Sequence, residues 1–402
     1  MSVNNNHMET EGIYLDNAAT TRVDDRVIRS MIPVFSQEYG NASSLHHFGT
    51  QAREVLENSR TTLAECIGAD SGEVYFTSGG TESNNWALKG IAESNRHKGR
   101  HIIVSSIEHD CVLNTCNWLA GQGFFVTYLP VDSSGLVDLE TLKKAINPKT
   151  ILVSVMHANN EIGTIEPVEE IGRICKKHDV YFHSDACQSF GKIPVDVNAM
   201  GIDLLTVNSH KIYGPKGIGA LYVRKGVDIA PLLHGGGQEA GLRSTTENMP
   251  AIVGFAEAAA ICLREMKSEA IRLSLLREKL VRFIFAECEN AYINGHQVQR
   301  LPGHLSFSFH GLEGETIRLL LMLDEMGIAV SAGSACSSND KSHNASHVLQ
   351  AIGLNPFEAR GAIRVSMGRF TTEAQLNIFT DSLGQALKSL TSIFSGNSIM
   401  NL

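Results

Sequence analysis

The sequence predicts an α/β protein built around a mostly parallel sheet with helices on both faces. First, short apolar segments alternate with helical segments of about 10–15 residues from residue 73 to residue 223, a pattern typical of parallel strands joined by crossover helices. Second, residues 150–156 (TILVSVM) are apolar almost throughout, as expected of a strand that is covered on both faces. Third, the pattern changes after Pro250 to one long helical segment followed by alternating strands, which indicates a second, smaller α+β unit.

The chain begins with elements that precede this alternation. Residues 13–21 predict a short strand that runs into a turn, and residues 24–37 have the apolar spacing of a helix. Residues 41–47 form a polar loop, and residues 51–67 predict an amphipathic helix. We expect residues 1–19 to pack with the C-terminal part of the chain.

The alternating part accounts for the large sheet. Strands are predicted at residues 73–77, 101–105, 124–129, 150–156, 180–184, 202–207 and 218–223. The intervening helices are predicted to begin near Ser83 and to cover residues 109–122, 139–146 and 168–178. In sheets of this kind, ligands bind beyond the carboxyl ends of the strands. Polar residues that follow these strands are therefore the candidate site residues.

The C-terminal part predicts a different arrangement. A helix is expected at residues 251–287 and an antiparallel strand at residues 304–309, where polar and apolar residues alternate. Further elements are expected at residues 315–326 (helix), 328–331 (strand), 362–366 (strand) and 372–394 (helix). A chain of 402 residues exceeds what one core usually covers. We therefore expect a large domain at residues 20–265 and a small domain formed by residues 1–19 and 266–402.

Composition limits the classes of function. Hydrophobic residues make up 43% and charged residues 19%, as in ordinary globular proteins. The net charge of -9 argues against direct nucleic-acid binding. No apolar run approaches the ~20 residues of a membrane span, and the first 11 residues are polar, unlike a signal peptide. The eight cysteines form no CxxC pair, which favours a reduced, cytoplasmic setting over a zinc site.

Lys211 lies on a turn between two predicted strands, in the segment VNSHKIYGPKGIG that spans residues 207–219. Gly214 and Pro215 are typical turn residues, so Lys211 is placed at a strand end. A lysine held there by polar neighbours can form a Schiff base with an aldehyde cofactor. An isolated loop lysine is more often simply solvated. The interpretation therefore depends on partners elsewhere in the chain.

Several polar residues at strand ends supply such partners. The turn at residues 78–82 (SGGTE) opens a helix, so that its N–H groups and the Thr81 hydroxyl could bind a phosphate. Asp185 ends a strand, and a carboxylate there could keep a pyridine nitrogen protonated. Gln188 and Asn160 could hydrogen-bond a phenolic ring oxygen.

His109, in EHD, could stack on the face of the same ring. Each of these residues alone would more often cap a helix or satisfy a core polar group. Taken together at strand ends, they point to pyridoxal 5'-phosphate (PLP) as the cofactor.

From about residue 13 to residue 390 the chain resembles the PLP-dependent cysteine desulfurases of the NifS/IscS type. The motifs that carry the resemblance are YLDNAATT, TSGGTESNN, EHDCVL, HANNEIGT, HSDACQSFGK, SHKIYGPKGIGALYVR, HGGGQE, SAGSACSS and AIRVSMGRFTTE. The resemblance implies the PLP-dependent transferase fold type I in a homodimer. It also implies conversion of L-cysteine to L-alanine, with the sulfur passed to an enzyme persulfide and then to an acceptor protein.

The resemblance also implies roles for single residues. Lys211 matches the Schiff-base lysine, Asp185 the partner of the pyridinium nitrogen, and His109 the stacking base that handles the substrate thiol proton. Gln188 and Asn160 match contacts to the ring oxygen. The positions that match phosphate-side contacts are Gly80, Thr81, Asn208, His210 and, offered across the dimer interface, Thr246.

Two further residues complete the implied site. Cys336, in the small and polar segment SAGSACSS, matches the cysteine that accepts sulfur, whereas six of the other seven cysteines lie in helical or strand patterns and are expected to be packed. Arg364 matches the guanidinium that grips the substrate carboxylate, with Asn160 beside it. The sequence departs from the family pattern at Gly80 (commonly Ala), Asn208 (often Ser) and Thr245 (commonly Gly). Residues 337–345 are more polar and slightly longer than usual, which leaves the sulfur acceptor open.

Alternatives remain at this stage. A selenocysteine lyase or an aminotransferase would share the fold, although a transaminase does not need Cys336. A catalytically silent docking protein would have no reason to keep Lys211. His343 and His347 have the i, i+4 spacing of metal ligands, but no acidic third ligand accompanies them, so we expect no metal. The expected partners are L-cysteine, a second copy of the chain and a sulfur-acceptor protein, with no membrane. An iron–sulfur scaffold, tRNA thiolation and DNA phosphorothioation all remain possible destinations of the sulfur.

Overall fold

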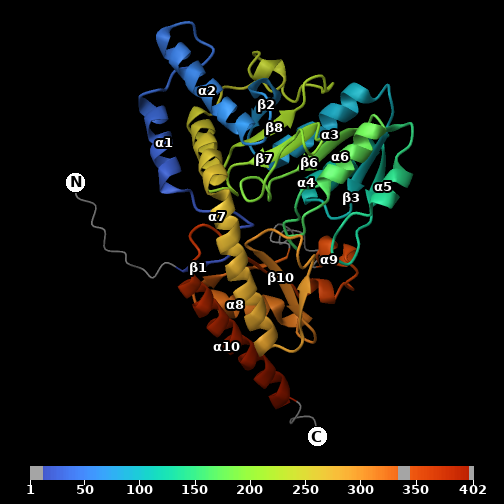
Figure 1. Ribbon diagram of the computed structural model, residues 1–402, viewed down its shortest axis with the longest axis vertical. Helices are drawn as coiled ribbons and strands as arrows, with labels where there is room; N and C mark the ends of the chain where they lie inside the picture. Colours follow the sequence, from blue (N-terminus) through green and yellow to red (C-terminus); the bar gives the residue numbers. More distant parts are fainter. Residues whose placement is uncertain (1–11, 334–344, 398–402) are drawn as a thin grey trace, which may run out of the picture.

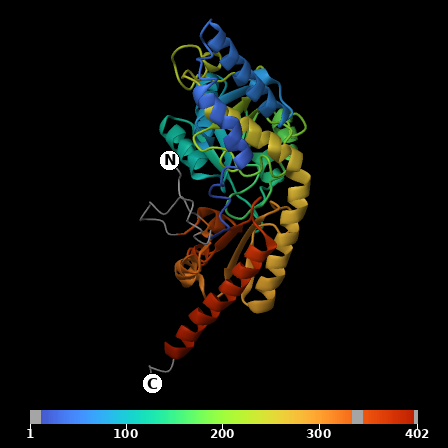
Figure 2. The same cartoon turned by 90° about the vertical axis from the view of Figure 1, so that its left-hand side faces the viewer.

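The computed structural model describes residues 12–333 and 345–397. Its two units are joined by one long helix, α7 (Met249–Glu287), which runs from the upper unit into the lower one in both views (Figures 1 and 2). The upper unit holds a seven-stranded sheet and the lower unit a four-stranded sheet. The long predicted helix at residues 251–287 is thus confirmed and starts two residues earlier.

The seven-stranded sheet has the order β2-β8-β7-β6-β5-β3-β4. Its strands are β2 (Val74–Thr77), β3 (His101–Ser105), β4 (Phe125–Leu129), β5 (Thr150–Ser154), β6 (Tyr181–Asp185), β7 (Leu204–Asn208) and β8 (Gly219–Val223). Only β8 runs antiparallel to its neighbours, β2 and β7, while all other pairs in this sheet are parallel. The prediction of a mostly parallel sheet is confirmed.

Helices cover both faces of this sheet. One hydrophobic core includes residues of α1 (Asp25–Ser36), α2 (His47–Glu65), α5 (Leu139–Ala145), α6 (Val168–Lys177) and the first half of α7. The other core includes residues of α3 (Gly80–Asn95) and α4 (Asp110–Gly121). Leu204 and Leu205 are neighbours on β7 but belong to different cores. The alternation of side chains along a strand explains why the buried strands are apolar throughout.

Besides α7, two helices begin earlier than the sequence indicates. The start of α2 is His47, because the ring Nδ1 of His46 accepts a hydrogen bond from the Gly49 N–H at 3.3 Å and caps the helix. The start of α3 is Gly80, three residues before Ser83. The Gly-Gly pair suggests a loop, but at Gly80 it permits a close approach: a Cβ there would lie 2.6 Å from the Cys187 Sγ.

The second unit contains a four-stranded antiparallel sheet of order β12-β13-β10-β9. Its elements are β9 (Ala291–Asn294), β10 (His304–Phe309), α8 (Thr316–Glu325), β12 (Ser331–Ala332), α9 (His347–Ala351), β13 (Ile363–Ser366) and α10 (Glu373–Asn397). Short 3-10 helices lie at Ser71–Glu73, Glu239–Gly241, Glu313–Glu315 and Glu358–Arg360. The α10 helix packs against α7 and α8. The sequence patterns did not predict β9 and α9, which are only four and five residues long.

The predicted strand at residues 328–331 is wrong as a single element. It divides into β11 (Ile328–Ala329), which pairs in parallel with β1 (Ile13–Tyr14), and β12, which joins the four-stranded sheet. As predicted for residues 13–21, a short strand, β1, is followed by a turn at residues 17–19. The chain then continues along β13, where the Asn17 N–H donates to the Ser366 carbonyl at 3.2 Å. The described residues at the start of the chain thus pack with the C-terminal part.

The division into domains stays a proposal, and the cores are compatible with it. On α7, the core of the first unit includes Cys262, and the core of the second unit begins at Leu276. Ile13 and Leu15 belong to the second core. In the part of the chain described, none of the helices combines the length and apolar character needed to cross a bilayer.

Candidate active site

The candidate site lies at the carboxyl edge of the large sheet. Two neighbouring parallel strands, β6 and β7, end at Asp185 and Asn208, and the turn that carries Lys211 follows β7 directly. On the far side of β8 from β7, β2 ends at Thr77 and leads into the first turn of α3. Sequence reasoning placed these groups at strand ends, and the sheet order brings them to one edge.

Asp185 is buried and accepts hydrogen bonds on both carboxylate oxygens. Its Oδ2 accepts from the Asn84 Nδ2 at 2.6 Å, and its Oδ1 accepts from the Cys187 N–H at 2.8 Å. The two N–H donors fix the orientation of this carboxyl group at the end of β6. Asn84 lies in the first turns of α3 and was not singled out from the sequence, although it belongs to the motif TSGGTESNN.

The first turn of α3 forms a cradle of the kind that binds a phosphate. Gly80 is the first residue of the helix, and a Cβ there would lie 3.5 Å from the Asn208 Nδ2. Asn208 is buried, and its Oδ1 has no hydrogen-bond partner among the described residues. Thr81 is exposed at the same end of the helix. Free N–H groups at a helix N-terminus, a buried amide and a hydroxyl match the needs of an anion.

His210 lies on the turn directly before Lys211. Its Nδ1 lies 3.1 Å from the Thr20 Oγ1. Burial and the positive charge of Lys211 lower the pKa of His210 to about 4. The imidazole is therefore neutral near pH 7, so one of its ring nitrogens carries a proton. A neutral His210 can then donate one hydrogen bond to a bound anion.

Lys211 points toward the segment that follows β1. Its Nζ donates to the Ala18 carbonyl and, at 2.7 Å, to the Ala19 carbonyl. The Ala18 carbonyl also accepts from the Gln188 Nε2 at 3.0 Å. The structure therefore brings Lys211 and Gln188 to the same backbone oxygen.

Arg364, on β13, is a buried cation at the junction of the two units. Its Nη2 donates to the Asp16 Oδ1 at 2.8 Å, and its Nη1 donates to the Asn160 carbonyl at 3.0 Å. The His304 Nε2 lies 3.1 Å from that same carbonyl. Asn160 thus meets Arg364 through its backbone, whereas the sequence suggested a role for its side-chain amide. The Arg364 Nε has no partner among the described residues.

His109 and a cysteine that was not predicted to be in the site lie beside Asp185. His109 caps α4, and its Nδ1 accepts from the Cys111 N–H at 3.1 Å. The Cys111 Sγ lies 3.1 Å from the His109 Nδ1 and 3.2 Å from the Asn84 Nδ2. Cys111 was expected to pack in the core as a helical cysteine. It is instead only half-buried and links His109 to the Asp185 cluster.

For two of the predicted site residues, Thr246 and Cys336, the described residues show no hydrogen bond to the groups above. Thr246 is exposed before α7, and no hydrogen bond within the described residues joins it to the groups above. Cys336 lies outside the described residues, as does His343. His347 is described, and its Nε2 lies 3.0 Å from the Glu108 carbonyl, next to His109.

Gly333 and Ser346 flank the segment that contains Cys336, and both lie against one buried carboxylate, Glu161. A Cβ at Gly333 would lie 2.9 Å from the Glu161 Oε2. Ser346 donates its hydroxyl proton to that oxygen at 2.5 Å. Both anchor points are therefore next to Asn160 and the Arg364 guanidinium.

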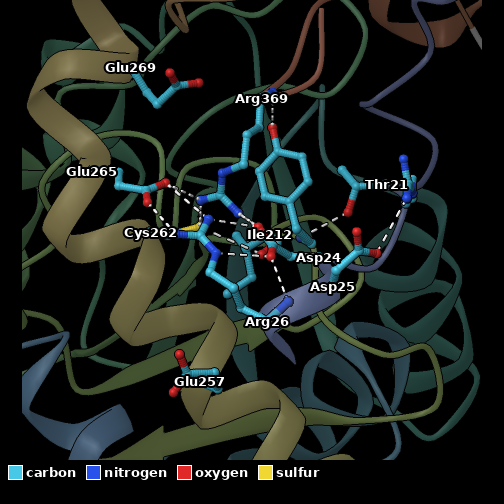
Figure 3. A network of polar contacts seen from close by, with 12 residues as sticks. Thr21, Asp24, Asp25, Arg26, Ile212, Glu257, Cys262, Glu265, Glu269 and Arg369 are labelled. Carbon is cyan, nitrogen blue, oxygen red and sulfur yellow. Dashed lines mark hydrogen bonds and ion pairs between the residues drawn. The ribbon is translucent and has the colours of Figure 1, made fainter. Parts of the chain in front are cut away.

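A network of charged side chains holds the turn that carries Lys211 (Figure 3). Tyr213, two residues after Lys211, donates its N–H to the Thr21 Oγ1 at 2.8 Å and accepts from the Asp24 N–H at 2.9 Å. Arg369 pairs with Asp24 at 2.9 Å and with Glu265 on α7 at 3.1 Å. The network thus connects both units and the start of the chain.

Comparisons with known proteins agree with this arrangement. The model of the aminotransferase class-V family matches residues 13–379. The cysteine desulfurase IscS of Dictyoglomus turgidum is 49% identical over 95% of this chain and 96% of that protein. A solved NifS-like protein superimposes with a TM-score of 0.87 at 42% identity, covering 94% of this chain and 99% of that one. The structure of SspA in complex with cysteine superimposes with a TM-score of 0.79 at 40% identity, covering 90% and 100% of the two chains.

The chain therefore belongs to the aminotransferase class-V family. The predicted α/β architecture with a smaller C-terminal unit is confirmed by this match and by the superpositions. Within the family, the chain belongs with the cysteine desulfurases of the IscS and NifS type, as the identities over nearly the whole chain show.

Proposed function

We propose that the chain is a PLP-dependent cysteine desulfurase that converts L-cysteine to L-alanine and passes the sulfur to an acceptor protein. The observation that carries the proposal is the position of Lys211. It lies in one site with the Asp185 cluster and the Gly80 cradle, and Arg364 stands at the junction beside it. A silent docking protein has no use for this arrangement.

The residues of the site fit PLP. Asp185 would hold the protonated ring nitrogen, because its buried carboxyl group is fixed at the strand end by two N–H donors. The phosphate would take the N-terminus of α3, where the backbone N–H groups, the Thr81 hydroxyl and the Asn208 Nδ2 beside Gly80 can donate hydrogen bonds to an anion. Gln188 would contact the phenolic oxygen, and His109 would stack on the ring. When bound, PLP supplies an electron sink that stabilises negative charge at the substrate Cα.

Three side chains then have separate roles in the reaction of L-cysteine. Arg364 binds the carboxylate of the substrate through its guanidinium and exchanges part of its contact with Asp16. The Lys211 amine takes up the Cα proton and returns a proton to the product. His109 accepts the proton of the substrate thiol.

Sulfur transfer is assigned to Cys336. Its thiolate would attack the substrate sulfur as the Cβ–S bond breaks, forming a persulfide on the protein and, after protonation of carbon, L-alanine. Support comes from the two residues that flank its segment, Gly333 and Ser346. Both meet Glu161, next to the residue whose carbonyl contacts Arg364.

We further propose that the protein is a homodimer in the cytoplasm. A homodimer would use the exposed Thr246 to complete the phosphate site of the partner subunit. The seven described cysteines are all unpaired thiols, which suits the reducing cytoplasm. The sulfur acceptor would be a scaffold or carrier protein.

The test is the reaction of the purified, PLP-loaded protein with L-cysteine. We expect L-alanine and protein-bound persulfide in equal initial amounts, and loss of both in Lys211→Ala. Lys216→Ala, an exposed lysine on the same turn, is the matched control and should retain activity. Turnover of selenocysteine alone would replace the proposal by a selenocysteine lyase, and amino transfer to a 2-oxo acid would replace it by an aminotransferase.

A further inference from the structure

Lys192 is a largely buried lysine that the proposed mechanism does not use. It follows Gly191, whose φ of +73° is in the left-handed region. A Cβ at Gly191 would lie 2.9 Å from the Ile212 side chain and 3.0 Å from the Cys262 Cβ. The chain therefore passes between the Lys211 turn and α7 at a point that only glycine fits. This turn directs Lys192 back toward Gln188, four residues earlier.

The Lys192 ammonium has one hydrogen-bond acceptor in the described part of the chain. Its Nζ donates to the Gln188 Oε1 at 3.3 Å. Burial, with the positive charge of Lys211, lowers the pKa of Lys192 to about 7. A buried amine with a single hydrogen-bond acceptor lowers the free energy of unfolding, because its desolvation is not offset. This cost favours a functional reason for the position of Lys192.

Charged groups around Lys192 do not neutralise it. Lys211 and Arg364 are cations, and His304, close by, is kept neutral by burial, which lowers its pKa. Cys187 and Cys262 also face it, and burial raises the pKa of both thiols, so both are uncharged.

The pocket beside Lys192 contains two carboxylates, Glu265 and Glu269. Glu265 is already paired with Arg26 and Arg369, and Glu269 with Arg272. Gln188 is therefore the group that Lys192 acts on.

Lys192 and Ala18 together determine which way the Gln188 amide points. A lysine side chain in its charged form only donates, and a backbone carbonyl only accepts. When Lys192 is charged, the amide oxygen therefore faces it, and the amide nitrogen faces the Ala18 carbonyl, 3.0 Å away. One N–H of the amide is used by Ala18. The second is left beside Lys211, which donates to the same carbonyl.

We propose that Lys192 is a positioning residue that fixes the Gln188 amide so that an N–H, and not the oxygen, faces the phenolic oxygen of PLP. A reversed amide would place two acceptors against each other at that point. The inference rests on the proposed function, since it assigns the ring oxygen to Gln188.

The test is a double-mutant cycle on PLP binding with Lys192→Met, Gln188→Leu and the combination. Methionine keeps the length of lysine and removes the buried charge, so the fold should be retained. Lys192→Met is expected to raise the PLP dissociation constant about five- to tenfold, the value of one lost hydrogen bond. It should also shift the absorption maximum of bound PLP, because the ring oxygen loses its donor. Lys216→Met, on the exposed surface, should change neither quantity.

The double variant shows whether Lys192 acts through Gln188. If Lys192 acts through Gln188, the double variant binds PLP like Gln188→Leu alone, and Lys192→Arg, another donor-only side chain, binds closer to wild type than Lys192→Met. Additive losses, or an Arg variant as weak as the Met variant, would overturn the inference. Unchanged affinity and spectrum in Gln188→Leu would instead contradict the assignment of Gln188 in the proposed function.

Discussion

The Arg369 guanidinium lies over the Tyr213 ring, 4.3 Å from its centroid, and the backbone N–H of Arg369 donates to the Tyr213 hydroxyl at 2.7 Å. Tyr213 is buried with a φ of +67°, a conformation that costs a residue other than glycine on the order of 1–3 kcal/mol. Arg369 belongs to the second unit and Tyr213 to the turn of Lys211. The contact therefore couples the position of the lysine to the packing between the units.

Arg369→Met tests this coupling through stability. Arg369 and Asp24 are 10% and 6% exposed, and the variant leaves Asp24 with Arg26 alone. We expect the free energy of unfolding to fall by about 2 kcal/mol, less than for a fully isolated buried pair because Arg26 remains. Denaturant titration measures this loss.

The matched control is Arg22→Met. Arg22 and its partner Asp25 are 57% and 64% exposed, so the change should be within about 0.5 kcal/mol. Equal effects of the two substitutions would show that the Arg369 network contributes no more than a surface pair.

The pH dependence of stability follows from buried histidines. Burial lowers the pKa of His183 to about 4, and it does the same for His157. The unfolded chain binds these protons near pH ~6.5, so between about pH 4 and 6.5 it holds more protons than the folded protein. The free energy of unfolding should therefore fall as the pH is lowered through this window and stay level, as far as these groups are concerned, above it.

His183→Gln isolates one of these contributions. His183 contacts the hydroxyls of Ser154 and Thr206, at 2.8 Å and 3.1 Å, which an amide can also serve. The slope of unfolding free energy against pH between 4 and 6.5 should shrink by up to about 1.4 kcal/mol per pH unit, the value of one proton. The exposed His97→Gln is the control, and a slope reduced equally in both variants would rule out His183 as the source.

Arg364→Ala should raise the KM for L-cysteine by about a hundredfold, since a charge pair of this kind is typically worth ~2–5 kcal/mol. Arg364→Lys keeps the charge and loses the fork of two donors, so it should recover only part of the affinity. Steady-state kinetics on PLP-loaded protein measure both. Because Asp16 loses its partner in the Ala variant, thermal unfolding must be recorded beside the kinetics. An unchanged KM in a folded variant would assign the carboxylate to another residue.

The sequence patterns located the residues that lie at strand ends but not those that reach them from elsewhere. Asp185 and Lys211 could be placed because buried apolar runs define where β6 and β7 stop. Asn84 is 101 positions before Asp185, and no local periodicity indicates that α3 crosses the end of β6. The same holds for Cys111.

Short elements were missed for a related reason. The division of residues 328–331 between two sheets depends on pairing with β1 and β13, which are distant in sequence. Two-residue strands carry no alternation of their own that a pattern could reveal. Lys192 lies in the motif HSDACQSFGK. The motif does not indicate the contact of Lys192 with Gln188, because this contact depends on the turn at Gly191.

The last prediction separates sulfur transfer from cofactor binding. Cys336→Ser replaces a thiol of pKa ~8.5 by a hydroxyl that does not ionise near neutrality. None of the groups assigned to PLP is altered, so the variant should bind PLP with wild-type affinity and still respond to L-cysteine with a change in the PLP absorption band. It should form no persulfide and no more than a trace of L-alanine. The matched control is Cys111→Ser, because Cys111 is the thiol next to His109 in the described site. Persulfide formation should survive in that variant. Persulfide that persists in Cys336→Ser and disappears in Cys111→Ser would transfer the acceptor role to Cys111, since a thiol 3.1 Å from an imidazole nitrogen can pass its proton to it.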